Sequence, residues 1–224
     1  MPTTHTFLEI SWTRIMNQIR PYSRIIFQRK WQILPLLLLG ALFTIWFWKG
    51  PISGHGGIPI LGRMEIFVAP FFQEDPLWSQ ESLGTSTDTI GSAGCALSSA
   101  AMVLRFYGVE VDPKKLNDYL IEHDGYEGAA WIKWEIAATF PPNIAEKRYE
   151  DLPSYGLIDW NLLRGNPVIV RIRRLTGKTH FMVVVGKQGL DYLVRDPAEK
   201  GRVGVYPFYE LGTPMEALRF YQKK

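Results

Sequence analysis

The sequence contains very little cysteine, since Cys95 is the only one in 224 residues. A single thiol excludes an internal disulfide. A metal site through Cys95 and His180 would need at least one further ligand, and the other histidines, His5, His55 and His123, have no partners at the spacing of metal ligands. We therefore expect neither a metal ion nor another cofactor.

The chain also lacks a basic stripe with interleaved aromatic residues. Its net charge is +3, but residues 1–50 hold six basic residues and one glutamate, whereas residues 51–224 hold 19 basic and 21 acidic residues. The excess of positive charge therefore belongs to the N-terminal segment, and we expect no nucleic acid partner. Internal repeats and low-complexity tracts are absent from the sequence as well.

A long uncharged run is present between Trp31 and Trp48, with the sequence WQILPLLLLGALFTIWFW. As a helix it would be about 27 Å long, close to the hydrocarbon thickness of a bilayer. Five basic residues precede it, so the positive-inside rule places the N-terminus in the cytoplasm. The alternatives are a buried core helix and a cleaved signal peptide, for which Trp46-Phe47-Trp48-Lys49 is a poor cleavage site.

These features divide the chain into four parts. We expect a basic cytoplasmic segment at 1–30, a single transmembrane helix at 31–48, a linker rich in glycine and proline at 49–64, and one folded domain at 65–224. The protein would then sit in the cell membrane with a single pass, contacting the lipid bilayer through residues 31–48 and holding its folded domain outside the cytoplasm. The sequence shows no clear oligomerisation face, so a monomer is assumed.

The folded domain begins with helical patterns and continues with strands. We expect a buried helix over Cys95–Tyr107, followed by helices after Asp112-Pro113, over Ala130–Phe140 and near Asp159–Arg164. Strands are expected at 167–174, 179–187, 191–195, 202–206 and 217–221, separated by turns that contain glycine. This order is typical of an α+β domain with one core and an antiparallel sheet.

Cys95 lies in the run GSAGCALSSAAMVLRFYG, at the first position of the expected buried helix. Unpaired N–H groups and the positive end of the helix dipole favour a thiolate there. Outside the cytoplasm disulfides are favoured, so an unpaired thiol is easier to explain if it is reactive. The alternative is an inert cysteine that packs as a small hydrophobic residue.

Three other residues offer the groups that a thiol protease needs beside its nucleophile. His180 begins the expected strand THFMVVV, and Asp196 follows the next strand, so that pairing of the two strands would bring them together. Gln73 precedes Cys95 and could donate to an oxyanion together with the backbone N–H of Cys95. The alternatives are a structural histidine, an ordinary turn aspartate and a surface amide.

Gln73, Cys95, His180 and Asp196, in this order and within GCALSSAAMV, GNPVIVRI, THFMVVVG and VRDPA, resemble the bacteriocin-processing leader peptidases, a group of papain-like cysteine peptidases. The resemblance covers roughly residues 66–221 and is closest to the stand-alone members of the group. The chain has no GxxxxGK[ST] motif, so we do not expect it to be a transporter itself. It implies that Cys95 is the nucleophile, His180 the general base and then acid, Asp196 the residue that orients His180, and Gln73 an oxyanion donor. Ala96 departs from the family, where glycine is common.

The resemblance implies a papain-like fold and a peptidase that hydrolyses bonds in a peptide or protein substrate, and the expected helix at 31–48 would anchor it in the membrane. Two other functions stay open: a catalytically silent module that binds a peptide or a partner protein, and an amidase or transferase that acts on cell-wall peptide. The spacing of Trp131 and Trp134 predicts core packing, with the lining of a groove as the alternative. Arg171, Arg173 and Arg174 are expected on a solvated strand face.

Overall fold

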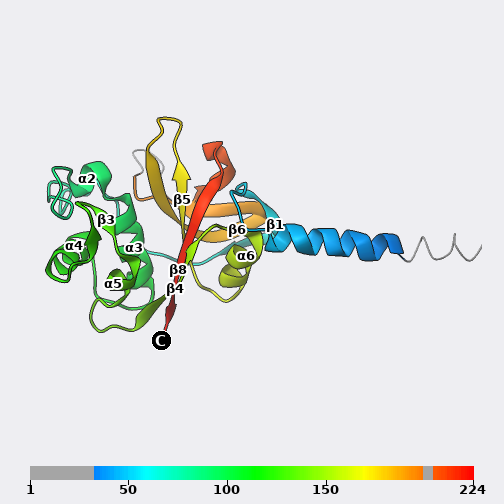
Figure 1. Ribbon diagram of the computed structural model, residues 1–224, viewed down its shortest axis with the longest axis horizontal. Helices are drawn as coiled ribbons and strands as arrows, with labels where there is room; N and C mark the ends of the chain where they lie inside the picture. The colour runs from blue at the N-terminus through cyan, green and yellow to red at the C-terminus, as the bar shows by residue number, and fades with distance from the viewer. Residues whose placement is uncertain (1–32, 199–203) are drawn as a thin grey trace, which may run out of the picture. The chain divides into compact units, whose positions relative to one another are not determined.

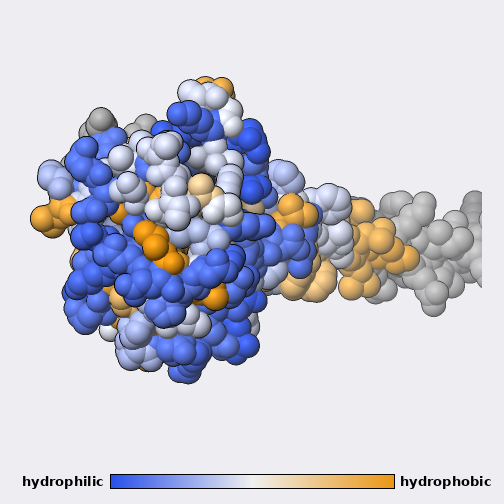
Figure 2. Space-filling view, turned by 60° about the vertical axis from the view of Figure 1, so that its left-hand side comes forward, coloured by the Kyte–Doolittle hydropathy of each residue, from blue (hydrophilic) through white to orange (hydrophobic). Residues whose placement is uncertain are grey.

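The computed structural model describes residues 33–198 and 204–224, and the chain divides into two compact units between Ile45 and Trp46. Residues 33–47 are helical, and most of their large apolar side chains are exposed, which Figure 2 shows as hydrophobic colour along this helix. Within the described ranges, no helix is both long enough and apolar enough to cross a bilayer. The expected cytoplasmic segment at 1–30 and the first two residues of the expected span lie outside these ranges.

The second unit is built on an antiparallel sheet with the strand order β1-β6-β5-β8-β4. A short strand, β7 (Tyr206–Pro207), adds to β6. The five main strands are β1 (His55–Glu65), β4 (Ala145–Asp151), β5 (Val168–Arg173), β6 (Thr179–Arg195) and β8 (Met215–Lys223).

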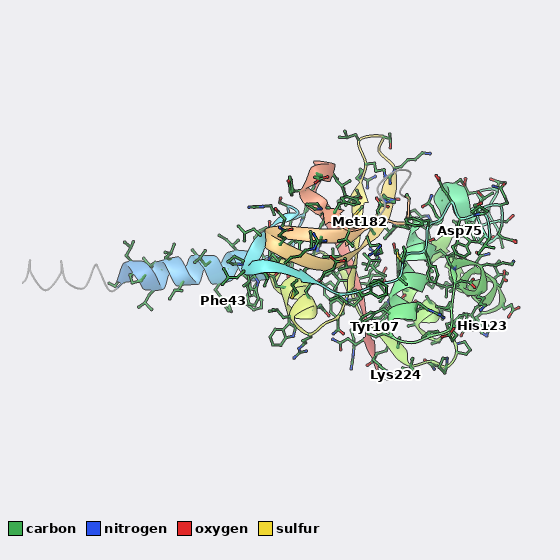
Figure 3. The ribbon with its side chains drawn as sticks, turned by 180° about the vertical axis from the view of Figure 1, so that it is seen from behind. Phe43, Asp75, Tyr107, His123, Met182 and Lys224 are labelled. Carbon is green, nitrogen blue, oxygen red and sulfur yellow. The ribbon has the colours of Figure 1, made fainter. Side chains whose placement is uncertain are left out.

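Helices cover this sheet unequally, as Figure 1 shows. One side carries α2, α3, α4 and α5 together with the small β2–β3 hairpin, and we call this group the helical half; α6 and the 3₁₀ helix η1 belong to the sheet half. In Figure 3, Tyr107 and His123 mark the C-terminal ends of α3 and α4 in the helical half, and Met182 lies in the sheet. The bounds are α2 (Ile90–Ala93), α3 (Cys95–Phe106), α4 (Pro113–Glu122), β2 (Tyr126–Glu127), β3 (Trp131–Ile132), α5 (Trp134–Ala138), α6 (Tyr155–Leu163) and η1 (Phe208–Leu211).

The sheet separates two hydrophobic cores because successive strand residues point to opposite faces. Phe181, Val183 and Val185 of β6 join the core that contains the apolar face of α3. Met182 and Val184 join the second core with Ile158 and Leu162 of α6. The buried helix α3 therefore packs against the face of β6 that carries Phe181, Val183 and Val185.

β6 reverses direction within its own length. Its 17 residues would extend over roughly 55 Å in a straight strand, yet His180 near its start and Asp196 just past its end are joined by a bond of 2.7 Å. Gly189 has a φ of +60° and lies beside the midpoint of the two residues, where a left-handed backbone favours glycine. The strands expected at 179–187 and 191–195 are thus two arms of one continuous element.

The structure differs from the expected linker at 49–64, because most of that segment is strand β1. β1 pairs with β6, with Met64 opposite Lys187 and His55 opposite Asp191. Gly57 and Gly62 have positive φ values, and the pairing shifts register between His55 and Arg63. Its glycine and proline content makes the segment look like a spacer, but the glycines serve an irregular edge strand.

Other elements match the expectations to different degrees. The helix at Cys95 is confirmed, as is the helix capped by Asp112, whose side chain accepts a hydrogen bond from the N–H of Lys115. The expected helix over Ala130–Phe140 is wrong in its first part, because residues there form β3 and leave only Trp134–Ala138 helical. α6 begins earlier than expected, because Ser154 caps it at Tyr155. β4 corresponds to no element that the sequence predicts. Of the strand expected at 202–206, residues 202 and 203 lie outside the described ranges.

Candidate active site

Cys95 occupies the junction between two helices. α2 begins with a capping box formed by Thr89 and Ser92 and ends at Gly94, whose N–H donates to the carbonyl of Ile90 at 2.8 Å. A Cβ at Gly94 would lie 2.4 Å from that same carbonyl, so the junction requires glycine. Cys95 then opens α3 as a partly exposed free thiol, at a helix N-terminus that no side chain caps.

His180 and Asp196 form a buried pair at the open end of β6. The Nε2 atom of His180 and Oδ1 of Asp196 are 2.7 Å apart, and both residues are less than 5% exposed. Asp196 is itself fixed, because it accepts hydrogen bonds from the N–H of Ala198 at 2.8 Å and from the hydroxyl of Tyr206 at 2.9 Å. With Nε2 bound to Asp196, the ring nitrogen left for Cys95 is Nδ1.

The electrostatics of this pair favour a charged histidine. Burial is the largest single effect on His180 and lowers its pKa, but the hydrogen bonds and charges of Asp196 and Cys95 together outweigh burial and raise the pKa above 6.5. Burial likewise raises the pKa of Asp196, but the partners of its carboxylate, His180 first among them, hold that pKa below its usual value. Both shifts favour the charged forms of the pair, and the thiol of Cys95 is the second partner of the histidine ring.

Gln73 is tied to both sides of this arrangement. Its side-chain amide donates to the carbonyl of Gly91 in α2 at 2.7 Å, and its backbone N–H donates to the carbonyl of Pro197 at 2.8 Å. Because the carbonyl of Gly91 can only accept, the end of the Gln73 amide that faces it is the nitrogen Nε2. Since Nε2 carries two hydrogens, one is left over after the bond to Gly91.

One cleft of about 650 Å³ is lined by Gln73, Cys95 and His180, with Asp196 behind the histidine ring. The structure therefore brings together all four residues singled out from the sequence. Cys95 belongs to the helical half and Gln73 to the segment that leads to it, whereas His180 and Asp196 lie at the two ends of β6. Within residues 33–198 and 204–224, no group of three or more His, Cys, Asp or Glu side chains is placed to hold a metal ion.

The cleft also contains residues that sequence reasoning missed or misplaced. Trp134 packs in the core as expected, but Trp131 is 59% exposed and lines the cleft. Arg171 and Arg174 line it too, together with Arg219 of β8, so the strand face that was expected to be solvated also forms a wall of the cleft. The alternation in PVIVRIRR contained a signal, because it places Arg171 on the same face as the core residue Ile169.

Comparison with known proteins identifies one matching family and two similar solved structures. The model of the Peptidase_C39 like family matches residues 66–221. The peptidase domain of Streptococcus ComA, a bi-functional ABC transporter of a quorum-sensing pathway, is 20% identical with a TM-score of 0.45, covering 58% of this chain and 91% of its own. A putative C39-like peptidase from Bacillus anthracis is 18% identical with a TM-score of 0.46, covering 72% of this chain and 98% of its own. No curated protein matches. Because the family model spans more than two thirds of the sequence, the chain belongs to the Peptidase_C39 like family.

Proposed function

We propose that the protein is a cysteine peptidase that uses Cys95, His180, Asp196 and Gln73. The observation that carries the proposal is the buried His180, which is bound by Asp196 on one ring nitrogen and interacts with the thiol of Cys95 in an open cleft. A histidine held between a carboxylate and a thiol is the arrangement that activates a thiol nucleophile. Membership of a peptidase family supports the same reaction.

The resting site would hold a Cys95 thiolate beside a His180 imidazolium. The raised pKa of His180 favours the charged ring, and the N-terminus of α3 favours the negative sulfur. The thiolate attacks the carbonyl carbon of a peptide bond and forms a tetrahedral intermediate with a negatively charged oxygen. The second Nε2 hydrogen of Gln73 and the backbone N–H of Cys95 are the donors for that oxygen.

Collapse of the intermediate breaks the C–N bond. His180 gives its proton to the departing amine, leaving an acyl group on the sulfur of Cys95 and a neutral ring. The ring then takes a proton from a water molecule that attacks the thioester, and the released acid restores the thiolate and the imidazolium. Asp196 holds the ring in one orientation throughout and stabilises its positive charge.

We also propose that residues 31–48 anchor the chain in a membrane and that the peptidase unit faces away from the cytoplasm. The support is the uncharged run, the five basic residues that precede it, and the exposed apolar side chains of the helix at 33–47. Substrates on the outer side would be peptides or proteins at the membrane surface.

The reactivity of the lone thiol tests the proposed activity. At neutral pH, iodoacetamide should label Cys95 in the full-length protein faster than in the same protein unfolded in urea, because only the folded chain places His180 beside the sulfur. Changing His180→Ala should remove the difference, and Cys95→Ala should abolish hydrolysis of a fluorogenic peptide library. Native labelling as slow as that of the unfolded thiol would show that the nucleophile is not activated and would favour a silent peptide-binding module.

A further inference from the structure

Two arginines lie side by side on the sheet wall of the cleft. In the register of β5 and β8, Ile169 is opposite Arg219, which places Arg171 two residues along on the same face. Arg171 is also directly opposite Phe181, which packs toward the helical half. The face of β5 and β8 that packs in the core at Ile169 therefore carries the positive charges of Arg171 and Arg219 where it borders the cleft.

The carboxylates around these arginines are shared with other cations. Glu216 lies 3.8 Å from Arg171 but 3.3 Å from Arg173, and Glu150 bonds Arg219 at 3.2 Å but Lys147 at 2.9 Å. Each carboxylate thus serves two positive groups. Lys147 also has a second carboxylate, that of Glu135 at 2.8 Å, so the four cations of this cluster face three carboxylates and one positive charge is left over.

Each arginine of the pair also has a buried donor with nothing to bind. Nε of Arg171 and Nη1 of Arg219 are fully buried, and neither has a hydrogen-bond partner among the described residues. A buried charged donor without an acceptor is costly, because its charge is not compensated by the protein. A negatively charged group in the cleft, beside the exposed parts of the two guanidinium groups, would offset this charge.

Packing against two aromatic rings fixes the position of the Arg219 side chain. The guanidinium of Arg219 lies over the rings of Trp134 and Phe181, at 5.1 and 5.0 Å from their centres, and only 11% of the side chain is exposed. Arg174 and Lys178 continue the positive wall toward the site, since Arg174 lies 4.0 Å from Asp196. The acidic residues that line the cleft, besides Glu150, are Asp88 and Glu127, both in the helical half.

We propose that this arginine wall selects peptides that carry a carboxylate, bound by Arg171 and Arg219 with Arg174 at its edge. A planar guanidinium matches the two oxygens of a carboxylate, and the cleft that the arginines line also contains Cys95 and His180, so this carboxylate would lie in the same cleft as the scissile bond. The carboxylate can belong to an Asp or Glu side chain or to the C-terminus of the peptide. The inference rests on the proposed function only in taking a peptide as the ligand.

Binding to the full-length Cys95→Ala protein tests the proposal without requiring hydrolysis. The probes are fluorescein-labelled hexapeptide pools in which one position is fixed as Glu or Gln, the other five are neutral, and the C-terminus is a free acid or an amide. Anisotropy titrations should show at least about tenfold tighter binding for Glu at one position, or for the free acid. In either case the preference should weaken as the salt concentration rises.

Variants assign the preference to the wall. Arg171→Gln should remove it, whereas Arg148→Gln, an exposed arginine paired with Glu146 on β4, should leave it unchanged. A substitution of Arg219 would disturb the packing around it, because this side chain is deeply packed. The double variant Arg171→Gln with Arg174→Gln is therefore used as the stronger test. Equal binding of acidic and neutral pools, or a preference that survives these changes, would overturn the inference. A preserved preference in a wild-type protein that hydrolyses no peptide would instead overturn the peptidase proposal alone.

Discussion

Asp196 acts on His180 through its charge as well as through its position. The carboxylate and the thiol raise the pKa of the ring although burial opposes them. In the proposed mechanism the imidazolium beside the thiol is the active form, so hydrolysis should be lost as the pH rises through the pKa of His180. We therefore expect Asp196 to set the upper pH limit of the proposed activity.

Changing Asp196→Asn should keep the hydrogen bond to His180 but remove the charge. The pKa of His180 should fall, and the alkaline limb of the pH profile of kcat/KM should move down by about one pH unit or more. Asp191→Asn is a matched control, because it alters the other His–Asp pair, with His55, outside the cleft. An unchanged limb in Asp196→Asn would show that the carboxylate only positions the ring.

Gln73→Ala separates stabilisation of the oxyanion from activation of the thiol. Loss of one oxyanion donor should lower kcat about 100- to 1,000-fold, while labelling of Cys95 by iodoacetamide, which creates no oxyanion, should keep its rate. Gln80→Ala, on an exposed residue outside the cleft, serves as the control. A parallel loss of labelling would mean that Gln73 acts by holding α2 through Gly91 and not as a donor.

The four candidate residues could be singled out from the sequence because their side chains have few chemical roles and occur in a specific order. Arg171 and Arg219 could not be singled out, and Trp131 only as the alternative to core packing, because each follows an ordinary pattern in its own segment. Their meeting in the cleft depends on the register between β5 and β8 and on the β2–β3 hairpin. Such pairings join residues that are far apart in the chain.

Among the elements, β1 shows how a polar network can fix an irregular strand. The carboxylate of Asp159 in α6 accepts from the N–H of Ile58 at 2.7 Å, from Lys187 at 2.9 Å and from the hydroxyl of Tyr192 at 2.8 Å. All three side chains of this network are almost fully buried. The network attaches β1 to both α6 and β6.

Gly57 is the position at which this attachment can be tested. A Cβ there would lie 2.3 Å from Oδ2 of Asp159 and 2.6 Å from the hydroxyl of Tyr192, and the φ of +72° is unfavourable for alanine. Gly57→Ala should lower the free energy of unfolding in urea by about 2–4 kcal/mol. Gly62→Ala has a similar φ of +82° but open space, so it should lose only about 1 kcal/mol. Equal losses would show that backbone strain alone matters.

The helices α3 and α4 and the strand β5 could be predicted because their apolar patterns and caps are local. β1 could not be predicted, because its glycine and proline residues usually indicate a spacer. In this protein they lie in an irregular edge strand. β4 could not be predicted either, because AEKRYED contains almost no apolar residue and gains its place by pairing with β8. Local patterns do not report pairings that form between distant segments.

For the whole molecule, the proposed anchor is open to direct test. The full-length protein should stay with membranes after alkaline carbonate extraction, and Leu38→Arg with Leu39→Arg should release it, because each charge costs roughly 3 kcal/mol at the centre of a membrane helix. Leu175→Arg, at a fully exposed leucine of the second unit, should stay bound. A membrane-impermeant maleimide should label Cys95 in intact cells; labelling only after lysis would place the unit in the cytoplasm.

Because β6 reverses direction, the four candidate residues come from two separate parts of the chain. His180 and Asp196 belong to one short stretch of chain, whereas Gln73 and Cys95 arrive with the helical half. Each half alone would hold either a base without a nucleophile or a nucleophile without a base. A chain that is still emerging from the ribosome, or one that is partly unfolded, would therefore carry only an unassisted thiol, and the proposed cleavage should begin only after both halves have folded together.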